Sequence, residues 1–545
     1  MIICWLQTSL ERVYPKTEPR FCRELEIEAT LGEKVSFQAC VRNSTTKEVN
    51  TRLEIVSASD LDVMVRRVGY VPMKHLNTDD DPEWEGTDFV PGFVPDPLYP
   101  ENSATTGPGE SHAFWLTVRI PKDAAPGNKE IKLRFLVDGN DVGTLTAFLQ
   151  VYPIAIQPLE NFPVVHWFYA DALCDYYKVE PYEERFWNVV EPYMRNVADH
   201  GSGQYVPIFT PPTDGVKRPH QLLKVNKRSD GRYEFDFSDV RKWILLARSS
   251  GAQYFEWTHL FTQWGAKNAI RVYRSNQDPA SLLWPPETEA TSPVYREFLA
   301  QFLPRFYEFL VSEGLLECSL FHISDEPHGE EHLENYRRAR EMVRELAPWM
   351  KTCDALSDVR FARENLTDMP IAIISTAMQF ADEGYETMVY FCCGPRGKYL
   401  NRLMDTPLAK IRMSGWLFHK LNARGFLHWG YNYWYKSQTQ ELIDPYSEQS
   451  GCAWPRWAYG DPFVVYPGPD GPIDSIRWEV FSESLQDLAL LRTLNVDPNS
   501  DLLSDIMSYD CFPKEAEWVY SSRKRLLGAT TQEPRSHSER KNNDS

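Results

Sequence analysis

The chain has no long hydrophobic run and no excess of positive charge. No stretch of its 545 residues approaches the roughly 18 consecutive apolar residues that a membrane-spanning helix needs. The 58 Lys and Arg residues are outnumbered by 77 Asp and Glu residues, which gives a formal net charge of −19. A chain of that charge repels phosphate backbones and anionic lipid surfaces. We therefore expect no nucleic-acid partner and no membrane partner.

Several signatures of metal and nucleotide sites are also missing. The ten cysteines form no CxxC pair of the kind that binds zinc, and no His/Glu cluster has metal-ligand spacing. No GxGxxG or GxxxxGKS/T motif follows a predicted strand, and no GxSxG elbow is present. We therefore expect no cofactor, no metal and no nucleotide. The cysteines, including the adjacent Cys392 and Cys393, are expected to be free thiols in a reducing compartment.

The N-terminal segment MIICWLQTSLERVYPK lacks the features of a secretory signal peptide. It has no basic stretch followed by a long apolar run. Together with the expected free thiols, this segment leads us to expect a cytoplasmic protein.

What the chain does contain is the composition of an ordinary globular protein. Hydrophobic residues make up 42% and charged residues 25%, so a large core can be buried. At roughly 100–200 residues per domain, the length predicts several domains, or one large barrel with an appended domain. Aromatic residues reach 13%, with 17 Trp among them, which suits stacking on flat apolar faces such as those of sugar rings.

Residues 1–155 have the alternating pattern of β-strands. In NKEIKLRFLVDG every second residue from Ile131 to Val137 is apolar, and the residues between them are mostly charged. GTLTAFLQVYP repeats this pattern, and ELEIEATLGEKVSFQACVRN contains two more strands around a Gly-containing turn. Short alternating strands separated by turns predict an antiparallel β-sandwich. The segment 91–110 is rich in Pro, Gly, Asn and Ser, and is predicted to be a long loop.

From about residue 156 onward, short apolar runs alternate with long amphipathic stretches. Eight strands are predicted, at 162–168, 203–209, 252–258, 317–323, 350–355, 370–376, 387–393 and 425–431. Helices with one apolar face are predicted between them, for example at 295–313 and 331–347. Eight such alternations predict an α/β fold, a TIM-like (β/α)8 barrel, over residues 156–527. An open, doubly wound sheet is the alternative. Residues 528–545 turn polar and lose periodicity, so a disordered tail is predicted.

The adjacent carboxylates Asp325 and Glu326 are the sharpest chemical feature. They follow the fourth predicted barrel strand, and in a barrel the chemistry lies at the carboxyl ends of the strands. Their side chains point in different directions, and their repulsion raises the pKa of one carboxyl, which favours a protonated acid near neutral pH. The competing interpretation is an Asp-Glu-Pro opening of a loop or helix.

Glycoside hydrolysis needs a second group opposite the acid, usually a carboxylate. The seventh predicted strand ends in Cys392, Cys393 and Gly394 without a carboxylate, and Glu256 lies within the third strand facing the core. A mechanism with two separate carboxylates therefore has little support. In substrate-assisted hydrolysis the sugar's own 2-acetamido group attacks, an Asp orients it, and a Glu acts as acid and then base. Adjacent Asp325 and Glu326 supply that arrangement.

Other strand-end residues are candidates for contacts with a sugar. The segment FLHWGYNYW after the eighth strand offers aromatic rings and an amide, of which Trp429, Asn432 and Trp434 are predicted to bind substrate. His259, after the third strand, and Arg396, after the seventh, are the other two predicted contacts. About half of the aromatic rings in this segment are expected to pack against the barrel wall, because strand side chains alternate.

The motifs FHISDEP, FCCGPRGKYLNRLMDTPLAKIRMSGW, GFLHWGYNYW, GDPFVVYPG and SIRWEVFSESLQDLALL resemble glycoside hydrolase family 123 over residues 160–495. The resemblance implies an N-terminal β-sandwich, a (β/α)8 barrel and exo-acting β-N-acetylgalactosaminidase activity. It also implies substrate-assisted retention by an adjacent Asp-Glu pair, which corresponds to Asp325 and Glu326. The implied partner is a glycoside or oligosaccharide with a terminal N-acetylhexosamine.

Two other functions stay open. The first is a glycosidase of the same scaffold that acts on a sugar without the acetamido group, with Asp171 or Asp354 as a second carboxylate. The second is a carbohydrate-binding protein without catalytic activity, although the intact Asp-Glu pair speaks against it.

Overall fold

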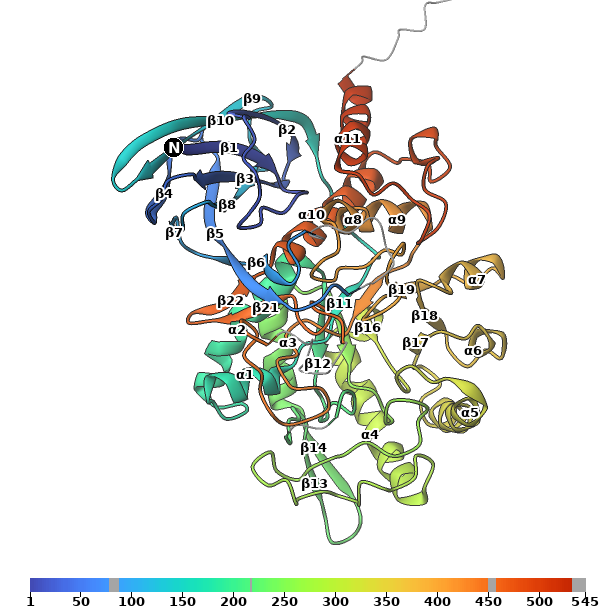
Figure 1. The fold of residues 1–545 in the computed structure, drawn as a ribbon. Coiled ribbons are helices and arrows are strands. Elements are labelled where there is room, and N and C mark those ends of the chain that lie inside the picture. Colours follow the sequence, from blue (N-terminus) through green and yellow to red (C-terminus); the bar gives the residue numbers. More distant parts are fainter. Residues whose placement is uncertain (78–87, 216–217, 449–456, 532–545) are drawn as a thin grey trace, which may run out of the picture.

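The alternating apolar residues of the N-terminal region form two β-sheets packed face to face (Figure 1). The computed structural model describes residues 1–77, 88–215, 218–448 and 457–531. One sheet has the order β1 (Ile2–Thr8), β3 (Lys34–Asn43), β8 (Glu110–Arg119), β5 (Asp62–Met73), β6 (Gly92–Tyr99). The other has the order β2 (Glu24–Leu31), β10 (Asn140–Ala155), β9 (Gly127–Val137), β4 (Val49–Ser57), β7 (Ser103–Thr106).

The predicted sandwich is confirmed, and its pairs are antiparallel except for β2 with β10, which run parallel. The alternation in β9 places Ile131, Leu133 and Phe135 in the core between the sheets. This face-to-face packing buries one side of each sheet, as the sequence pattern requires.

The prediction of a long loop over 91–110 is wrong. That segment contains β6 and β7, and its first strand includes Pro95 and Pro97. Proline cannot donate to a strand ladder, so it is tolerated at a sheet edge. β6 is an edge strand, paired on one side with β5, which explains how a proline-rich segment can be extended and paired.

Eight parallel strands form the predicted barrel. They are β11 (Val164–His166), β12 (Gly203–Val206), β15 (Tyr254–Trp257), β16 (Ser319–Leu320), β17 (Cys353–Leu356), β18 (Met369–Ile373), β19 (Met388–Tyr390) and β20 (Phe426–His428). All eight lie within or overlap the predicted runs. The sheet order β16-β15-β12-β11-β20-β19-β18-β17 follows the chain around the barrel, and a parallel bridge between Phe321 and Thr352 links its two ends. This closure confirms the barrel and excludes an open sheet.

Helices surround the barrel, except that the last one lies beside the sandwich, where its Arg523 pairs with Glu33 (Figure 1). They are α1 (Ala170–Tyr177), α2 (Glu184–His200), α3 (Ser238–Ser250), α4 (Pro293–Ser312), α5 (Gly329–Leu346), α6 (Arg360–Arg363), α7 (Ala377–Asp382), α8 (Leu408–Arg412), α9 (Ser414–Lys420), α10 (Ile476–Thr493) and α11 (Ala516–Thr531). Two hairpins extend from the barrel, β13 (Lys224–Lys227) with β14 (Tyr233–Asp236), and β21 (Val465–Gly468) with β22 (Gly471–Asp474). The predicted helices at 295–313 and 331–347 correspond to α4 and α5.

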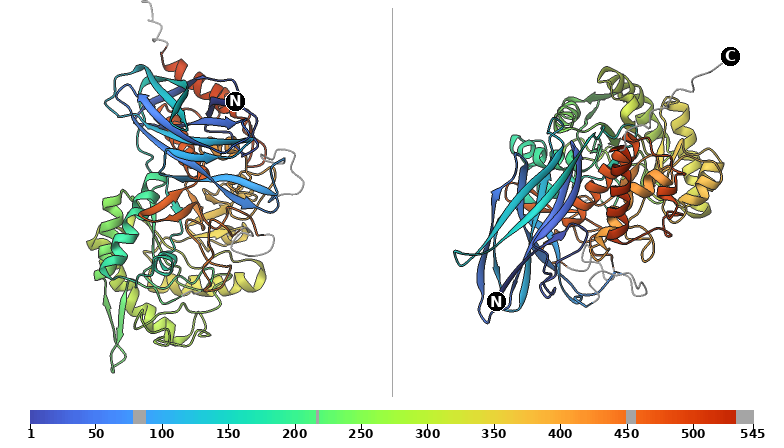
Figure 2. Two further views of the ribbon diagram at one scale, coloured as in Figure 1. Left: turned by 60° about the vertical axis from the view of Figure 1, so that its left-hand side comes forward. Right: turned by 90° about the horizontal axis from the view of Figure 1, so that it is seen from above.

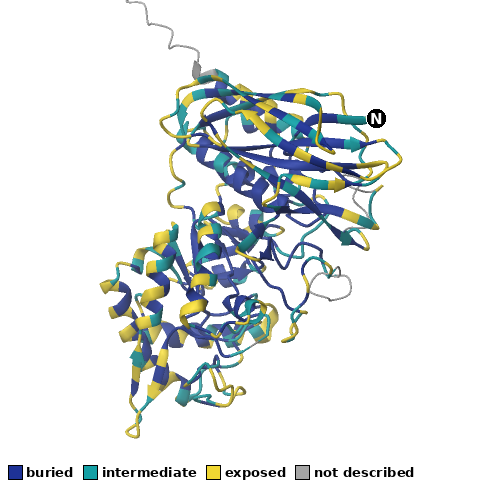
Figure 3. Cartoon of the chain, turned by 90° about the vertical axis from the view of Figure 1, so that its left-hand side faces the viewer, coloured by how far each residue is buried: buried dark blue, intermediate teal, exposed yellow. Residues whose placement is uncertain are grey.

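Helix α10 joins the two lobes, which lie side by side in Figure 2. Almost every residue of α10 is buried, and two of its charged residues are paired with the sandwich. Glu479 accepts ion pairs from Lys34 and Arg66 of the sandwich, and Arg477 pairs with Asp96 at 2.9 Å. In Figure 3 the elements between the lobes are coloured as buried, while exposed residues gather on the outer helices. The paired charges dock the sandwich onto the barrel in one orientation, because a buried charge without its partner is costly.

The crossing of α9 over α10 depends on a glycine. A Cβ atom at Gly415 would lie 1.8 Å from the carbonyl oxygen of Ser484. We expect Gly415→Ala to lower the free energy of unfolding by about 1–3 kcal/mol, because a backbone atom cannot move aside as a side chain can. Chemical denaturation measures this. Gly528→Ala in α11 is the matched control, since a Cβ there meets nothing within 4 Å and should leave stability unchanged or slightly higher. Equal stability of the two variants would contradict the prediction.

The C-terminal part differs slightly from the sequence prediction. Helix α11 continues to Thr531, four residues beyond the predicted end of the folded region at Leu527. Residues 532–545 of the predicted tail lie outside the described residues. In the part of the chain that the structure describes, no helix combines the length and apolar character required for a membrane span. The nine cysteines of the described residues are all free.

Candidate active site

The carboxyl ends of the barrel strands surround a pocket of about 220 Å³. Its aromatic walls are Trp167, Trp264, Tyr390, Trp429, Tyr433 and Trp457. Three carboxylates face the same pocket, those of Asp214, Asp325 and Glu326. Aromatic walls with a few convergent polar groups are typical of a site for a small ligand.

Asp325 and Glu326 lie in the turn that follows β16. Helix α5 begins only at Gly329, with His328 at its N-cap position, so neither carboxylate caps the helix. Glu326 has a φ of 41°, in the left-handed region that residues other than glycine rarely adopt. Backbone strain of this kind clusters at functional sites, where the surrounding structure enforces it. Asp325 and Glu326 thus lie in the loop that leads into α5 without capping the helix.

A loop from the neighbouring strand holds this turn in place. The N–H of Trp264 donates to the carbonyl oxygen of Asp325 at 2.7 Å, and the hydroxyl of Ser324 donates to the carbonyl oxygen of Thr262 at 2.7 Å. Trp264 also has a positive φ, 58°, and its ring lines the pocket. The loop after β15 and the turn after β16 thus fix each other at the pocket rim.

The carboxyl group of Asp325 is buried, with 6% of the residue exposed. Burial, together with the negative charges of Glu326 and Asp214, holds the pKa of Asp325 well above its usual range. The predicted repulsion within the pair thus raises the pKa of Asp325. A ligand that donates a hydrogen bond to the ionised carboxylate would lower that pKa again.

Glu326 is less buried than its neighbour and is oriented by a tyrosine. The hydroxyl of Tyr390, at the end of β19, donates to Glu326 Oε1 at 2.7 Å. Burial and the adjacent Glu326 hold the pKa of Tyr390 well above its usual range, so the phenol remains a donor. This bond fixes one carboxylate oxygen and leaves the other to face the pocket.

Asp214 is a third carboxylate that the sequence argument did not select. It lies in the loop after β12 with a φ of 57°, and its Oδ2 accepts a hydrogen bond from the hydroxyl of Tyr169 at 2.7 Å. Its backbone carbonyl accepts a bond from Tyr433, which also lines the pocket. No apolar run or motif marks the position, because a long loop carries it into the site.

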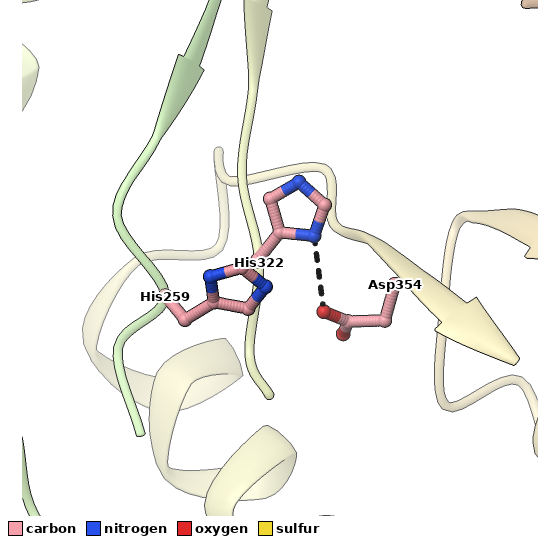
Figure 4. Close-up of side chains that lie close together, drawn as sticks. All are labelled: His259, His322 and Asp354. Atoms are coloured by element: carbon pink, nitrogen blue, oxygen red, sulfur yellow. Dashed lines mark hydrogen bonds and ion pairs between the residues drawn. The ribbon is translucent and has the colours of Figure 1, made fainter. Parts of the chain in front are cut away.

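The residues before Asp325 pack on a buried cluster of titratable groups, of which Figure 4 shows His259, His322 and Asp354. His322 is placed between Glu256, at 3.1 Å, and Asp354, at 3.3 Å. Burial opposes a charge on His322, but Cys353, Glu256 and Asp354 outweigh it and hold the pKa of His322 well above its usual range. Glu256 faces the core, as expected, and accepts the indole N–H of Trp167 at 2.6 Å.

Asp354 anchors the turn that carries Asp325 and Glu326. Its carboxylate accepts the backbone N–H groups of Ile323 and Ser324, the residues that precede Asp325. The hydroxyl of Tyr336 from α5 donates to its other oxygen. Because Asp354 is fully buried and has these partners, it is not available as a nucleophile for a sugar.

Among the residues that the structure describes, two groups of side chains have the spacing of metal ligands. One is His259, His322 and Asp354, whose ligand atoms lie within 4.8 Å of one another. The fold brings them together from three strands, which sequence spacing does not reveal. The oxygens of Asp354 already accept the bonds named above, so these residues suit an internal hydrogen-bond network better than a cation. The other group includes Glu479, whose ion pairs with Lys34 and Arg66 oppose a second cation.

Comparison with known proteins agrees with this geometry. The family profile "Glycoside hydrolase 123, catalytic domain" matches residues 167–494, more than half of the chain. The chain belongs to glycoside hydrolase family 123. Family 123 membership makes it a glycoside hydrolase, with a glycan as substrate.

Solved structures support the fold of this family 123 hydrolase. A family 123 glycoside hydrolase from Clostridium perfringens, studied for glycolipid glycan hydrolysis, superimposes with a TM-score of 0.73 at 16% identity, over 97% of this chain and 98% of that one. A Bacteroides ovatus GH5 xyloglucanase gives a TM-score of 0.28 at 9% identity, over 85% and 98% of the two chains, which is too low to carry an argument. No curated protein sequence matches the chain significantly.

The family 123 pocket contains some of the predicted residues and not others. Asp325, Glu326 and Trp429 line it. Asn432 is fully buried and bonds with both its amide atoms to the backbone of Tyr169, so it joins the ends of β20 and β11 instead of meeting a sugar. Trp434 is fully buried and donates to the carbonyl oxygen of Val465. The alternation of side-chain directions ends with β20 at His428, so it does not set the directions of Asn432 and Trp434. Both side chains point into the protein interior.

The other two predicted contacts also lie outside the pocket lining. His259 is 1% exposed and packs on His322 and Trp167, and burial holds its pKa well below the usual range. Arg396 donates to the carbonyl oxygens of Cys393 and Asn77, so it fixes the loop after β19. We assign both residues structural roles in the family 123 scaffold.

Proposed function

We propose that this family 123 hydrolase is an exo-acting β-N-acetylhexosaminidase, specifically a β-N-acetylgalactosaminidase. In the proposed reaction the substrate's 2-acetamido group attacks the anomeric carbon, and configuration is retained through an oxazolinium intermediate. The observation that carries the proposal is the adjacent pair at the pocket. A buried Asp325 with a raised pKa stands beside a Glu326 held by Tyr390.

The roles follow from the substrate-assisted mechanism: the raised pKa of Asp325 favours its protonated form in the free pocket, and a substrate N–H with a developing positive charge would favour its ionised form. Asp325 would accept the acetamide N–H, and its negative charge would stabilise the positive charge that develops on the oxazoline ring. Glu326 would donate a proton to the glycosidic oxygen and later remove one from the attacking water. The deep, small pocket supports removal of one terminal sugar at a time. Glycans with a terminal N-acetylhexosamine are the proposed substrate class, because the proposed reaction needs a 2-acetamido group on the sugar.

A second candidate is a glycosidase for sugars without an acetamido group. Asp214 supports it, because this carboxylate shares the pocket with Glu326 and could act as a protein nucleophile. Its hydrogen bond from Tyr169 would orient it. In this candidate function Asp214 takes the place of Asp171 and Asp354 as the second carboxylate. Asp171 lies outside the pocket lining, and Asp354 is buried below the pocket.

A set of 4-nitrophenyl β-glycosides tests these functions. The set pairs N-acetylgalactosamine with galactose, and N-acetylglucosamine with glucose, so each pair differs only at carbon 2. We expect hydrolysis of the acetylated sugars, fastest for the galacto form, and none of the plain sugars. Hydrolysis of the plain sugars alone would favour the Asp214 mechanism. If nothing is hydrolysed while sugar still binds, the protein is a carbohydrate-binding protein.

We also propose that the protein is cytoplasmic. The nine free cysteines of the described chain support a reducing, cytoplasmic location, where the substrate would be an imported oligosaccharide. Fractionation of the native cells tests it.

A further inference from the structure

Two tryptophans of the pocket share one hydrogen-bond acceptor. The indole N–H of Trp429 donates to Asp461 Oδ2 at 3.0 Å, and the indole N–H of Trp457 donates to the same oxygen at 3.1 Å. The two rings stand at 86° to each other, with centroids 6.4 Å apart. They therefore form a corner of the pocket in which one carboxylate oxygen accepts both indole N–H groups.

Asp461 itself does not reach the pocket. It is 1% exposed, and its other oxygen, Oδ1, lies 3.5 Å from His428 Nε2. The Nδ1 atom of His428 accepts the N–H of Gly430, so the ring carries its proton on Nε2, facing the carboxylate. Asp461 can thus influence a bound sugar only through the side chains that it holds.

The backbone fixes the distance between Asp461 and Trp429. A Cβ atom at Gly430 would lie 2.1 Å from the carbonyl oxygen of Asp461, so the two segments touch where a side chain has no room. The N–H of Tyr433 donates to the carbonyl oxygen of Pro462 at 3.0 Å, which continues this contact along the segment. These backbone contacts therefore hold the segment that carries the Asp461 carboxylate against the segment that carries Trp429.

We propose that Asp461 is a positioning residue that sets the affinity of the pocket for sugar, by holding Trp429 and Trp457 as two walls against the sugar ring. The proposal rests on the proposed function insofar as it takes this pocket to be the sugar site. Burial is the main cause that raises the pKa of Asp461 to about 7, while the two indole N–H groups and the cations Arg396 and Arg402 lower it. A buried carboxylate costs free energy unless hydrogen bonds compensate for its lost hydration, and here the two indole N–H groups provide such bonds.

Asp461→Asn is the first test, with Asp505→Asn as its matched control. Asp505 Oδ2 accepts the indole N–H of Trp518 at 3.0 Å, an Asp–Trp bond outside the pocket. Kinetics are measured on the glycoside that the wild type hydrolyses best. We expect Asp461→Asn to raise KM about tenfold with little change in kcat, because a binding interaction common to substrate and transition state is weakened. Asp505→Asn should change neither. An unchanged KM in folded Asp461→Asn would overturn the proposal.

A double-mutant cycle shows whether Asp461 acts through the indoles. The double variant Trp429→Phe/Trp457→Phe keeps flat rings but has no N–H donors, so adding Asp461→Asn should raise KM no further. A further tenfold rise would mean that Asp461 acts by another route. If Asp461→Asn does not fold, the Trp429→Phe/Trp457→Phe variant provides the test. It keeps the Asp461 carboxylate but lacks both indole donors, so the proposal requires that it raise KM.

Tryptophan fluorescence gives a readout that needs no substrate. Asp461→Asn should shift the emission of the wild type, and should not shift that of the Trp429→Phe/Trp457→Phe variant. If the wild type hydrolyses only plain glycosides, the proposed function fails, but the KM comparison still applies to those substrates. If it hydrolyses none, the emission shift alone decides, and its absence from Asp461→Asn would overturn the positioning role.

Discussion

Replacing Asp325 by Asn should reduce kcat on an N-acetylated substrate by about 10²–10³-fold and should raise the melting temperature. The loss of activity follows because Asn keeps the size of the side chain but lacks the charge that stabilises the developing oxazolinium ion. Since that interaction strengthens in the transition state, the effect should fall on kcat more than on KM. Steady-state kinetics and thermal unfolding of the same preparation measure both effects.

The gain in stability follows from the raised pKa of Asp325. The folded state holds this proton more tightly than the unfolded state, so the group contributes stability below the usual Asp pKa of about 3.9, and that contribution is lost as pH rises through the higher folded pKa. At neutral pH the buried carboxyl therefore costs stability, and Asn removes the cost. The stabilisation by Asp325→Asn should shrink at pH 4. A lower melting temperature at neutral pH would contradict this account.

Two controls separate Asp325 from a protein nucleophile. Azide should not rescue Asp325→Asn by forming a glycosyl azide of inverted configuration, because no protein nucleophile has been removed. If Asp214 were the nucleophile, Asp214→Ala would be the variant that azide rescues. A thiazoline mimic of the intermediate should bind the wild type far more tightly than the plain sugar does. Turnover near the wild-type value in Asp325→Asn, without thiazoline inhibition, would end the substrate-assisted proposal.

The barrel strands were predictable because each lies in a short run of mainly apolar residues, and most of these strands are buried on both sides. Such runs can be recognised without knowing which strands lie beside them, and all eight predicted positions coincide with strands. The segment around β6 was not predictable in this way. Its prolines signal a loop locally, and only its position at the sheet edge makes a strand possible.

The site was predictable only where it is attached to a strand end. Asp325 and Glu326 come shortly after the predicted run 317–323, which contains β16, so the barrel rule was enough to select them. Asp214 and Trp457 reach the pocket on loops whose paths depend on contacts distant in sequence. Asp461 lies in the motif GDPFVVYPG, which the sequence comparison noticed without a role, because its function depends on two indole rings that only the fold brings together.

Replacing Glu326 by Gln should reduce turnover on substrates with poor leaving groups by about 10²–10⁴-fold, the usual contribution of general acid–base catalysis. An alkyl or sugar leaving group needs a proton on the glycosidic oxygen as the bond breaks, and Gln has none to give. A 2,4-dinitrophenyl leaving group departs without a proton, so formation of the intermediate should be affected much less. Rates for sugar, 4-nitrophenyl and 2,4-dinitrophenyl leaving groups therefore form a graded test.

Tyr390→Phe is the matched control for Glu326→Gln, because it removes the hydroxyl that orients Glu326 but keeps the carboxyl group. We expect it to lose about tenfold in kcat on a sugar leaving group, since a misplaced acid still carries its proton. The loss should again be smaller on 2,4-dinitrophenyl glycosides, which ties Tyr390 to proton transfer and not to sugar binding. Equal losses on all leaving groups in Glu326→Gln would remove the acid/base role from Glu326. The carboxylate of Asp214 would then be the remaining candidate in the pocket for that proton.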